Sequence, residues 1–210
     1  VLAQTGELRV VRGACQAYGR TAPYQLWRGV FHRLLGLDEN SPADERVQQV
    51  PAGIAALDEA LVPQAALLAP VLDLPLDSEV EGMAQGAEER SVARRTLLVN
   101  LFRKAARQTA RTGRTLTLVL EDLHWLDAAS EELWAQIGQA ATAVPALVLT
   151  TARPAAGVGK PAPGSLQGAT LMTLSPLNAE AAAEVAKRQF GAAGFADQAG
   201  TLVPTVVERS

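Results

Sequence analysis

The sequence predicts an α/β fold, a parallel sheet flanked by helices, from three observations. The six residues 115–120 are all β-branched or leucine and carry no charge on either face, as in a central strand that is covered on both sides. The run ends abruptly in two carboxylates, Glu121 and Asp122. A helix candidate stands directly before this strand and another directly after it. Together these features favour a strand whose carboxyl end carries a polar site.

Composition narrows the classes of protein further. A length of 210 residues suits one large domain or one and a half, and a hydrophobic fraction of 48% is enough for a core. The net charge of −3 argues against a nucleic-acid-binding surface on this segment. The longest apolar runs are short and broken by prolines, which excludes a membrane-spanning helix, and no signal peptide opens the chain. The lone Cys15 cannot form an internal disulfide, which favours a cytoplasmic location and a packing role for this thiol.

The amino-terminal elements are read from periodicity and capping residues. Residues 8–15 form the first strand, and residues 21–36 form a helix with Thr21 as its cap and Gly36 at its end. Its apolar stripe includes Tyr24 and Trp27, for which core packing is favoured over stacking against a base. His32 lies off this stripe among polar neighbours, so we expect it at the surface.

Residues 38–86 are the least informative stretch. Ser41 and Pro42 with two following acids indicate a helix start, and short helices are expected over residues 54–61 and 64–68. Residues 87–112 are the longest helix candidate, with glutamates in the first turn and arginines near the end, as the helix dipole prefers. The basic residues of this helix are interpreted as mostly a solvated face. The alternative that one of these arginines acts in trans is less favoured and stays open.

After the central strand the elements alternate again. A helix over residues 129–141 is capped by Asp127 or Ser130, and a strand over residues 146–152 leads to Arg153. A last strand is expected over residues 169–174. Asn178 then caps a helix that runs from residue 179 to residue 190.

Acids at the carboxyl end of a parallel strand lie at the edge where such sheets bind ligands. They suit a hydrated magnesium ion and an attacking water beside a nucleotide phosphate. For Glu121 and Asp122 alone, a solvated turn or a helix cap would be the better interpretation.

The longer string at residues 118–127, Leu-Val-Leu-Glu-Asp-Leu-His-Trp-Leu-Asp, decides between them. It resembles the Walker B segment of P-loop ATPases. More specifically, it resembles the AAA-type ATPase domain of the STAND class, found in large LuxR-type transcription regulators and adenylate or guanylate cyclase fusion proteins. His124, Trp125 and Asp127 stand in register with that pattern. Leu126 departs from it, because a small residue is usual there.

The resemblance implies ATP and Mg²⁺ as ligands. It places Glu121 where the magnesium shell is oriented and Asp122 where water is polarised, and it groups His124 and Asp127 with the nucleotide-binding residues. The order of the two acids is inverted relative to most P-loop proteins. A slow switch, in which bound ATP biases one conformation, therefore suits the pair better than fast hydrolysis.

Two further stretches bear on the same resemblance. Residues 150–154 resemble the sensor segment, which implies that Arg153 contacts the γ-phosphate with its forked guanidinium. The stretch 157–160 mimics a phosphate loop, but Pro154 and Pro161 stand where glycine and Ser/Thr belong. We therefore reject it as a nucleotide site.

The resemblance also implies a sheet ordered 5-1-4-3-2, in which residues 8–15, 115–122, 146–152 and 169–174 are strands 2 to 5. Strand 1 and its Walker A loop are then expected before Val1, in a longer protein. Residues 1–177 would be an incomplete P-loop ATPase core with a helical insertion at about 20–112. Residues 178–210 would begin a helical lid.

The expected function is an ATP-binding signalling switch within a larger regulatory protein, such as a transcription regulator or a cyclase. Hydrolysis is expected of the full-length protein and not of these 210 residues alone. Expected partners are ATP or ADP, other domains of the same polypeptide and further copies in a homo-oligomer, with neither nucleic acid nor membrane bound directly. The alternative is a degenerate ATPase fold that serves as an interaction scaffold. An intact glycine-rich loop with lysine upstream would favour the switch.

Overall fold

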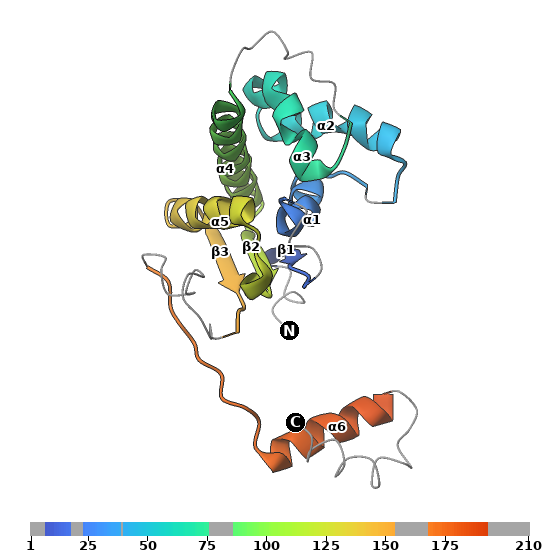
Figure 1. The fold of residues 1–210 in the computed structure, drawn as a ribbon, viewed down its shortest axis with the longest axis vertical. Coiled ribbons are helices and arrows are strands. Elements are labelled where there is room, and N and C mark those ends of the chain that lie inside the picture. The colour runs from blue at the N-terminus through green and yellow to red at the C-terminus, as the bar shows by residue number, and fades with distance from the viewer. Residues whose placement is uncertain (1–6, 18–22, 39, 76–85, 154–167, 193–210) are drawn as a thin grey trace. The chain divides into compact units, whose positions relative to one another are not determined.

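The computed structural model describes residues 7–17, 23–38, 40–75, 86–153 and 168–192. The chain divides into two compact units, Val1–Thr170 and Leu171–Ser210 (Figure 1). Thr21 and the rejected phosphate-loop mimic at residues 157–160 lie outside the described residues.

The first unit is built on a three-stranded parallel sheet, as the sequence predicts. Strands β1 (Leu8–Ala14), β2 (Thr115–Glu121) and β3 (Ala146–Thr150) lie in the order β1-β2-β3. This is the order expected for strands 2, 3 and 4 of the predicted sheet. The register sets Val11 beside Leu118, and Leu118 beside Val148. The uncharged strand at residues 115–120 is therefore the central strand of the described sheet.

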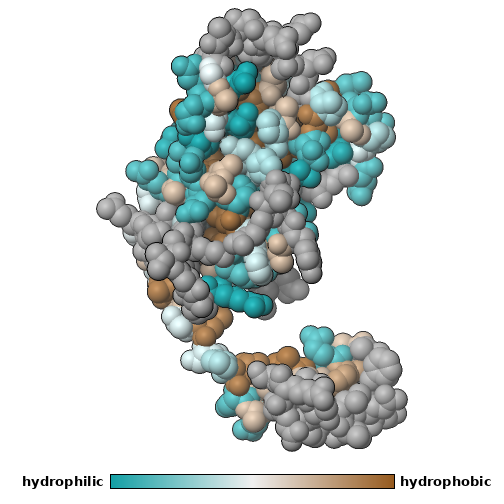
Figure 2. Space-filling view, viewed as in Figure 1, coloured by the Kyte–Doolittle hydropathy of each residue, from teal (hydrophilic) through white to brown (hydrophobic). Residues whose placement is uncertain are grey.

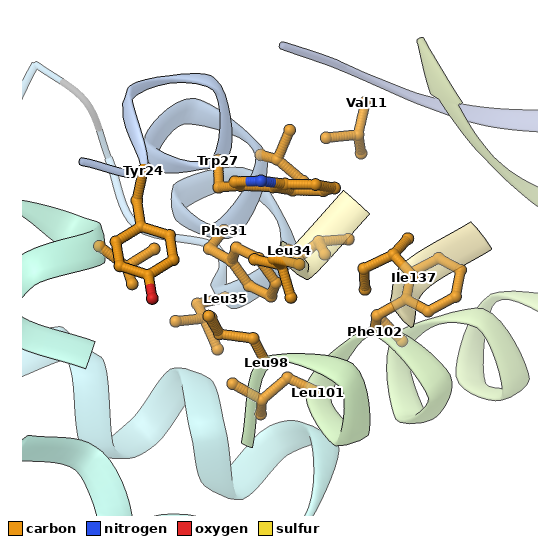
Figure 3. Close-up of a cluster of buried hydrophobic side chains, with 14 of the residues drawn as sticks. Val11, Tyr24, Trp27, Phe31, Leu34, Leu35, Leu98, Leu101, Phe102 and Ile137 are labelled. Carbon is orange, nitrogen blue, oxygen red and sulfur yellow. The ribbon is translucent and has the colours of Figure 1, made fainter. Parts of the chain in front are cut away.

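One face of the sheet packs against helices. Side chains alternate along a strand, so the register places Val11, Leu118 and Val148 on the same face. Helices α1 (Gln25–Leu35), α4 (Ala87–Arg111) and α5 (Ala128–Ala141) contribute the rest of this core, which Figure 3 shows around Trp27 and Phe102. We call this surface of the sheet the covered face.

The opposite face, which we call the open face, is different. Leu147 and Leu149 of β3 lie on it and are 41% and 45% exposed. Among the described residues, the apolar side chains of this face do not join the core cluster. On the central strand β2 this face is better covered, because Thr117 is 2% exposed. Among the described residues, the expected cover on both sides is therefore found on β2 and fails on the edge strand β3.

Helix α1 buries the aromatic stripe that its periodicity predicts. Tyr24 and Trp27 are buried, as expected of packing residues, and Gly36 ends the helix in a left-handed conformation. The helix begins at Gln25, four residues later than predicted, because Tyr24 adopts φ 62° and turns the chain into it. The surface position expected for His32 is wrong. His32 is 2% exposed, and its Nε2 lies 3.0 Å from the carbonyl oxygen of Leu72.

The burial of His32 follows from the helices inserted between α1 and α4. These are α2 (Ala43–Leu57), the 3₁₀ helix η2 (Glu59–Leu68) and α3 (Ala69–Leu72). Helix α3 packs on α1 and covers the face that carries His32. Asp58 accepts a hydrogen bond from the amide of Ala60 and pairs with Lys104 of α4 at 2.7 Å. The insertion is thus tied to the core helices at its middle, through Asp58, and at its carboxyl end, through Leu72.

Two arginines of α4 depart from the expected solvated face. Arg94 donates to the carbonyl of Leu67 at 2.9 Å and lies 5.8 Å from the ring centroid of Tyr24. Arg95, with 13% of its side chain exposed, pairs with Glu132 of α5. Both guanidinium groups hold α4 to neighbouring helices, so neither points freely to solvent.

The second unit contains helix α6 (Ala179–Ala192), which Asn178 caps by accepting the amide of Ala181 at 2.8 Å, as predicted. The predicted strand at residues 169–174 is wrong. This segment has no ladder partner among the described residues, and Leu171, Met172 and Leu174 are 62%, 78% and 84% exposed. Figure 2 shows apolar surface on the segment that leads into α6. A strand requires a neighbour to receive its backbone hydrogen bonds, so an apolar segment does not form a strand by itself.

Candidate functional site

The candidate site lies where the three parallel strands end. Because the strands are parallel, Cys15, Asp122 and Thr151 each follow the carboxyl end of a strand at one edge of the sheet. The amide of Cys15 donates to the carbonyl of Glu121 at 3.0 Å, so the ladder holds the backbone up to the first acid. Glu121 is the half-buried last residue of β2, and the chain leaves the sheet at Asp122.

Asp122 takes a left-handed backbone conformation, with φ 59° and ψ 41°. Among residues with a side chain, aspartate is one of the few that tolerate this conformation, and such residues collect at functional turns. Its carbonyl accepts the amide of Trp125 at 2.9 Å and opens the single 3₁₀ turn η4 (Leu123–Trp125). The side chain is 55% exposed. The turn therefore presents the second carboxylate to solvent at the edge of the sheet.

His124 lies beside this carboxylate. Its Nδ1 is 3.8 Å from Oδ1 of Asp122, and 12% of its side chain is exposed. The ring is tilted by 44° against Trp125, with the centroids 4.9 Å apart. The structure thus brings together Glu121, Asp122 and His124, three of the site residues that the sequence predicts.

Asp127 has a structural role in the fold. One carboxylate oxygen accepts the amide of Ser130 at 2.9 Å and the other accepts the Ser130 hydroxyl at 2.6 Å. Of the two residues considered as the cap of α5, Asp127 is the one that caps it. The carbonyl of Ser130 in turn accepts the indole N–H of Trp27 at 3.3 Å, which joins α5 to α1. Nucleotide binding by Asp127 stays a prediction.

The pKa of the Cys15 thiol reflects the charges at this edge. Burial, which has the largest effect, and the negative charges of Asp127 and Asp122 together raise the pKa of this thiol to about 11. The thiol is therefore protonated at neutral pH, which agrees with a packing role. The effect of both aspartates on one thiol also shows that their charges reach the same corner of the molecule.

Arg153 lies three residues beyond the end of β3, and its side chain is exposed. It follows the same edge of the sheet as the acids. Its contact with a γ-phosphate is untested and stays a prediction.

Thr151 is the residue of this edge that the sequence did not single out. Its hydroxyl accepts the amide of Asp122 at 3.1 Å, its own amide donates to Leu120 at 3.0 Å, and its carbonyl accepts the amide of Leu123 at 2.9 Å. The available signal was a pair of threonines at the end of a predicted strand. Which amide a hydroxyl there would accept depends on the register between β2 and β3, which only the structure gives.

The donor set can be tested against a magnesium ion. The described residues contain no group of three or more histidine, cysteine, aspartate or glutamate side chains able to hold a metal. Magnesium beside a nucleotide needs only one or two carboxylates, because water and phosphate oxygens complete its octahedron. Glu121 and Asp122 therefore fit magnesium bound together with a nucleotide, and they do not make a self-contained metal site.

Comparison with protein families gives one result that bears on this edge. A family model described as AAA ATPase domain matches residues 2–149, which includes all three strands except the last residue of β3. No curated protein and no solved structure matches the chain. Within the part of the chain that the structure describes, no helix has the length and apolar character that a membrane crossing requires.

Proposed function

Because the chain belongs to the AAA ATPase domain family, we propose that it is the ATP-binding module of a larger cytoplasmic signalling protein of the STAND class, and that bound ATP with Mg²⁺ switches its conformation. One observation carries this proposal. The central strand β2 delivers Glu121 and Asp122 to the carboxyl edge of a parallel sheet, the edge at which open α/β sheets bind ligands.

Each residue of the edge has a chemical task in this proposal. Glu121 orients the hydration shell of the metal, and Asp122 orients a water molecule and accepts its proton. Bound magnesium supplies neutralisation of the charge on the phosphates. Arg153 follows the neighbouring strand and offers a permanently charged fork to the terminal phosphate. His124 stands 3.8 Å from Asp122 and helps to fix that carboxylate.

Slow turnover suits this arrangement better than fast hydrolysis. The residue proposed to polarise water is an aspartate, one methylene shorter than the glutamate usual there, and it stands on a left-handed turn. A long-lived ATP complex can bias one conformation of the module and pass that bias to other domains of the same polypeptide or to further copies in an oligomer.

The test is made on the full-length protein as its gene encodes it. We expect Asp122→Asn to keep MgATP affinity within about threefold and to lower turnover by about 10²-fold or more, as loss of a general base does. The control is Asp44→Asn, which removes an exposed acid in the first turn of α2 and should change neither quantity. Binding is measured by calorimetric titration and turnover by phosphate release.

Two results would contradict this assignment. Unfolding of the Asp122→Asn protein without a specific loss of hydrolysis would make Asp122 a structural residue. Wild-type protein that binds no MgATP would favour the alternative of a degenerate ATPase fold that serves as an interaction scaffold. The observation that supports the scaffold alternative is the exposure of Leu147 and Leu149.

A further inference from the structure

The contacts of Thr151 separate into two kinds. Its amide and carbonyl make backbone hydrogen bonds to Leu120 and Leu123, and any residue other than proline could make both. Its side-chain hydroxyl alone accepts the amide of Asp122, at 3.1 Å. Removing the hydroxyl therefore removes one contact with the acid turn and leaves the two backbone bonds across the strand ends in place.

That one contact lies at the left-handed residue of the site. Asp122 is left-handed at φ 59°, a conformation that residues with a side chain rarely adopt and that persists only when the surroundings hold it. Its amide is held by the Thr151 hydroxyl, one residue beyond the end of β3, and the amide of Leu123, the first residue of η4, is held by the Thr151 carbonyl. The direction of the Asp122 side chain follows from this backbone, so the hydroxyl bears on where the carboxylate points.

We propose that Thr151 is a positioning residue for Asp122, and that it connects the strand leading to Arg153 with the acid that orients water. The inference rests on the proposed function. Thr151 stands two residues before Arg153 and is bonded to residues on both sides of Asp122. A movement of the end of β3, where the terminal phosphate would be sensed, is thereby transmitted to the backbone of Asp122. Thr151 itself touches no substrate and acts through Asp122.

The chain offers a matched set of variants. Thr151→Val keeps the shape of the side chain and removes the acceptor, whereas Thr151→Ser keeps the acceptor. Thr150→Val makes the same chemical change one residue earlier, where the residue is paired with Leu120 inside the ladder. In the full-length protein, each variant is measured for turnover, for the KM of MgATP and for thermal stability.

We expect Thr151→Val to lower kcat by about tenfold or more, because small misplacements of a reacting group cost orders of magnitude in rate. The KM should stay within about threefold. Thr151→Ser should recover most of the rate, and Thr150→Val should match the wild type. An unchanged kcat in Thr151→Val overturns the proposal, as does an equal loss in Thr151→Val and Thr151→Ser.

A double variant tests whether the effect passes through Asp122. If Thr151 acts only by placing that carboxylate, adding Thr151→Val to Asp122→Asn should lower kcat no further. A full additional loss in the double variant overturns the proposal and leaves the function of the site intact. If Asp122→Asn itself turns over ATP like the wild type, the proposed function fails first and the role of Thr151 falls with it. The two failures are therefore distinguishable.

Discussion

The two faces of the sheet use similar apolar residues and meet different surroundings. On the covered face, Leu116, Leu118 and Leu120 of β2 are at most 1% exposed beneath the helices. On the open face, Leu147 and Leu149 of β3 are 41% and 45% exposed. A parallel sheet is normally covered on both faces, and both strands carry the uncharged sequence typical of that burial. The difference shows that apolar sequence marks a face as suited to packing and does not determine what packs on it.

The largest expected effect compares one leucine from each face. Leu118→Ala should lower the free energy of unfolding by about 2–5 kcal/mol, because it leaves a cavity under the helices. Leu149→Ala should cost less than about 1 kcal/mol, because nearly half of that side chain already contacts water. Urea unfolding followed by circular dichroism measures both. Equal losses would mean that the open face is covered in solution and would remove the contrast.

The second prediction uses two neighbouring residues of β1 that point to opposite faces. A Cβ on Gly13 would lie 2.6 Å from the carbonyl oxygen of Leu26 and 2.9 Å from Cγ2 of Val30, so α1 would have to move. Gly13→Ala should therefore cost about 1–3 kcal/mol of stability.

The control for Gly13 is Ala14→Ser, on the exposed side of the strand, which should change stability by less than about 0.5 kcal/mol. Thermal unfolding of the two variants gives the comparison. A neutral Gly13→Ala would show that α1 does not pack as closely on the sheet as the structure places it.

The third prediction compares a buried and an exposed position of the same strand end by thiol reactivity, using the single cysteine of the chain. Cys15 is buried, and its pKa is raised from 9.0 to about 11. At pH 8 it should react with a disulfide reagent at least about tenfold more slowly than the thiol in the A14C/C15S variant, because the thiolate is the reacting form. Stopped-flow absorbance measures both rates. Equal rates would show that position 15 is open to solvent.

The raised pKa of Cys15 also sets the direction of a pH effect. Between pH 9 and about pH 11 the unfolded chain has lost the thiol proton and the folded chain keeps it. The contribution of this group to stability is thus fully present below pH 9 and is lost as the pH rises through that window. Cys15→Ser should remove this part of the alkaline decline in stability.

Much of the fold and part of the site could be predicted because they depend on neighbouring residues. The uncharged run at residues 115–120 gave the central strand, and Asn178 and Gly36 marked helix ends through local hydrogen bonds or a left-handed turn. The position of Glu121 and Asp122 at the carboxyl edge of the sheet followed from the same strand, since parallel strands end together. The match of residues 2–149 to the AAA ATPase domain family agrees with the resemblance carried by residues 118–127.

The sequence by itself thus determined the type and limits of most elements and the placement of the acid pair, because periodicity, caps and strand ends are set within a few residues of chain. The tertiary structure decided the rest. His32 is buried by a helix 40 residues away, and Thr151 reaches an amide 29 residues before it. The segment at residues 169–174 fails as a strand because no described neighbour pairs with it. Burial and cross-strand hydrogen bonds belong to pairs of distant segments, and no local pattern contains the register that brings such pairs together.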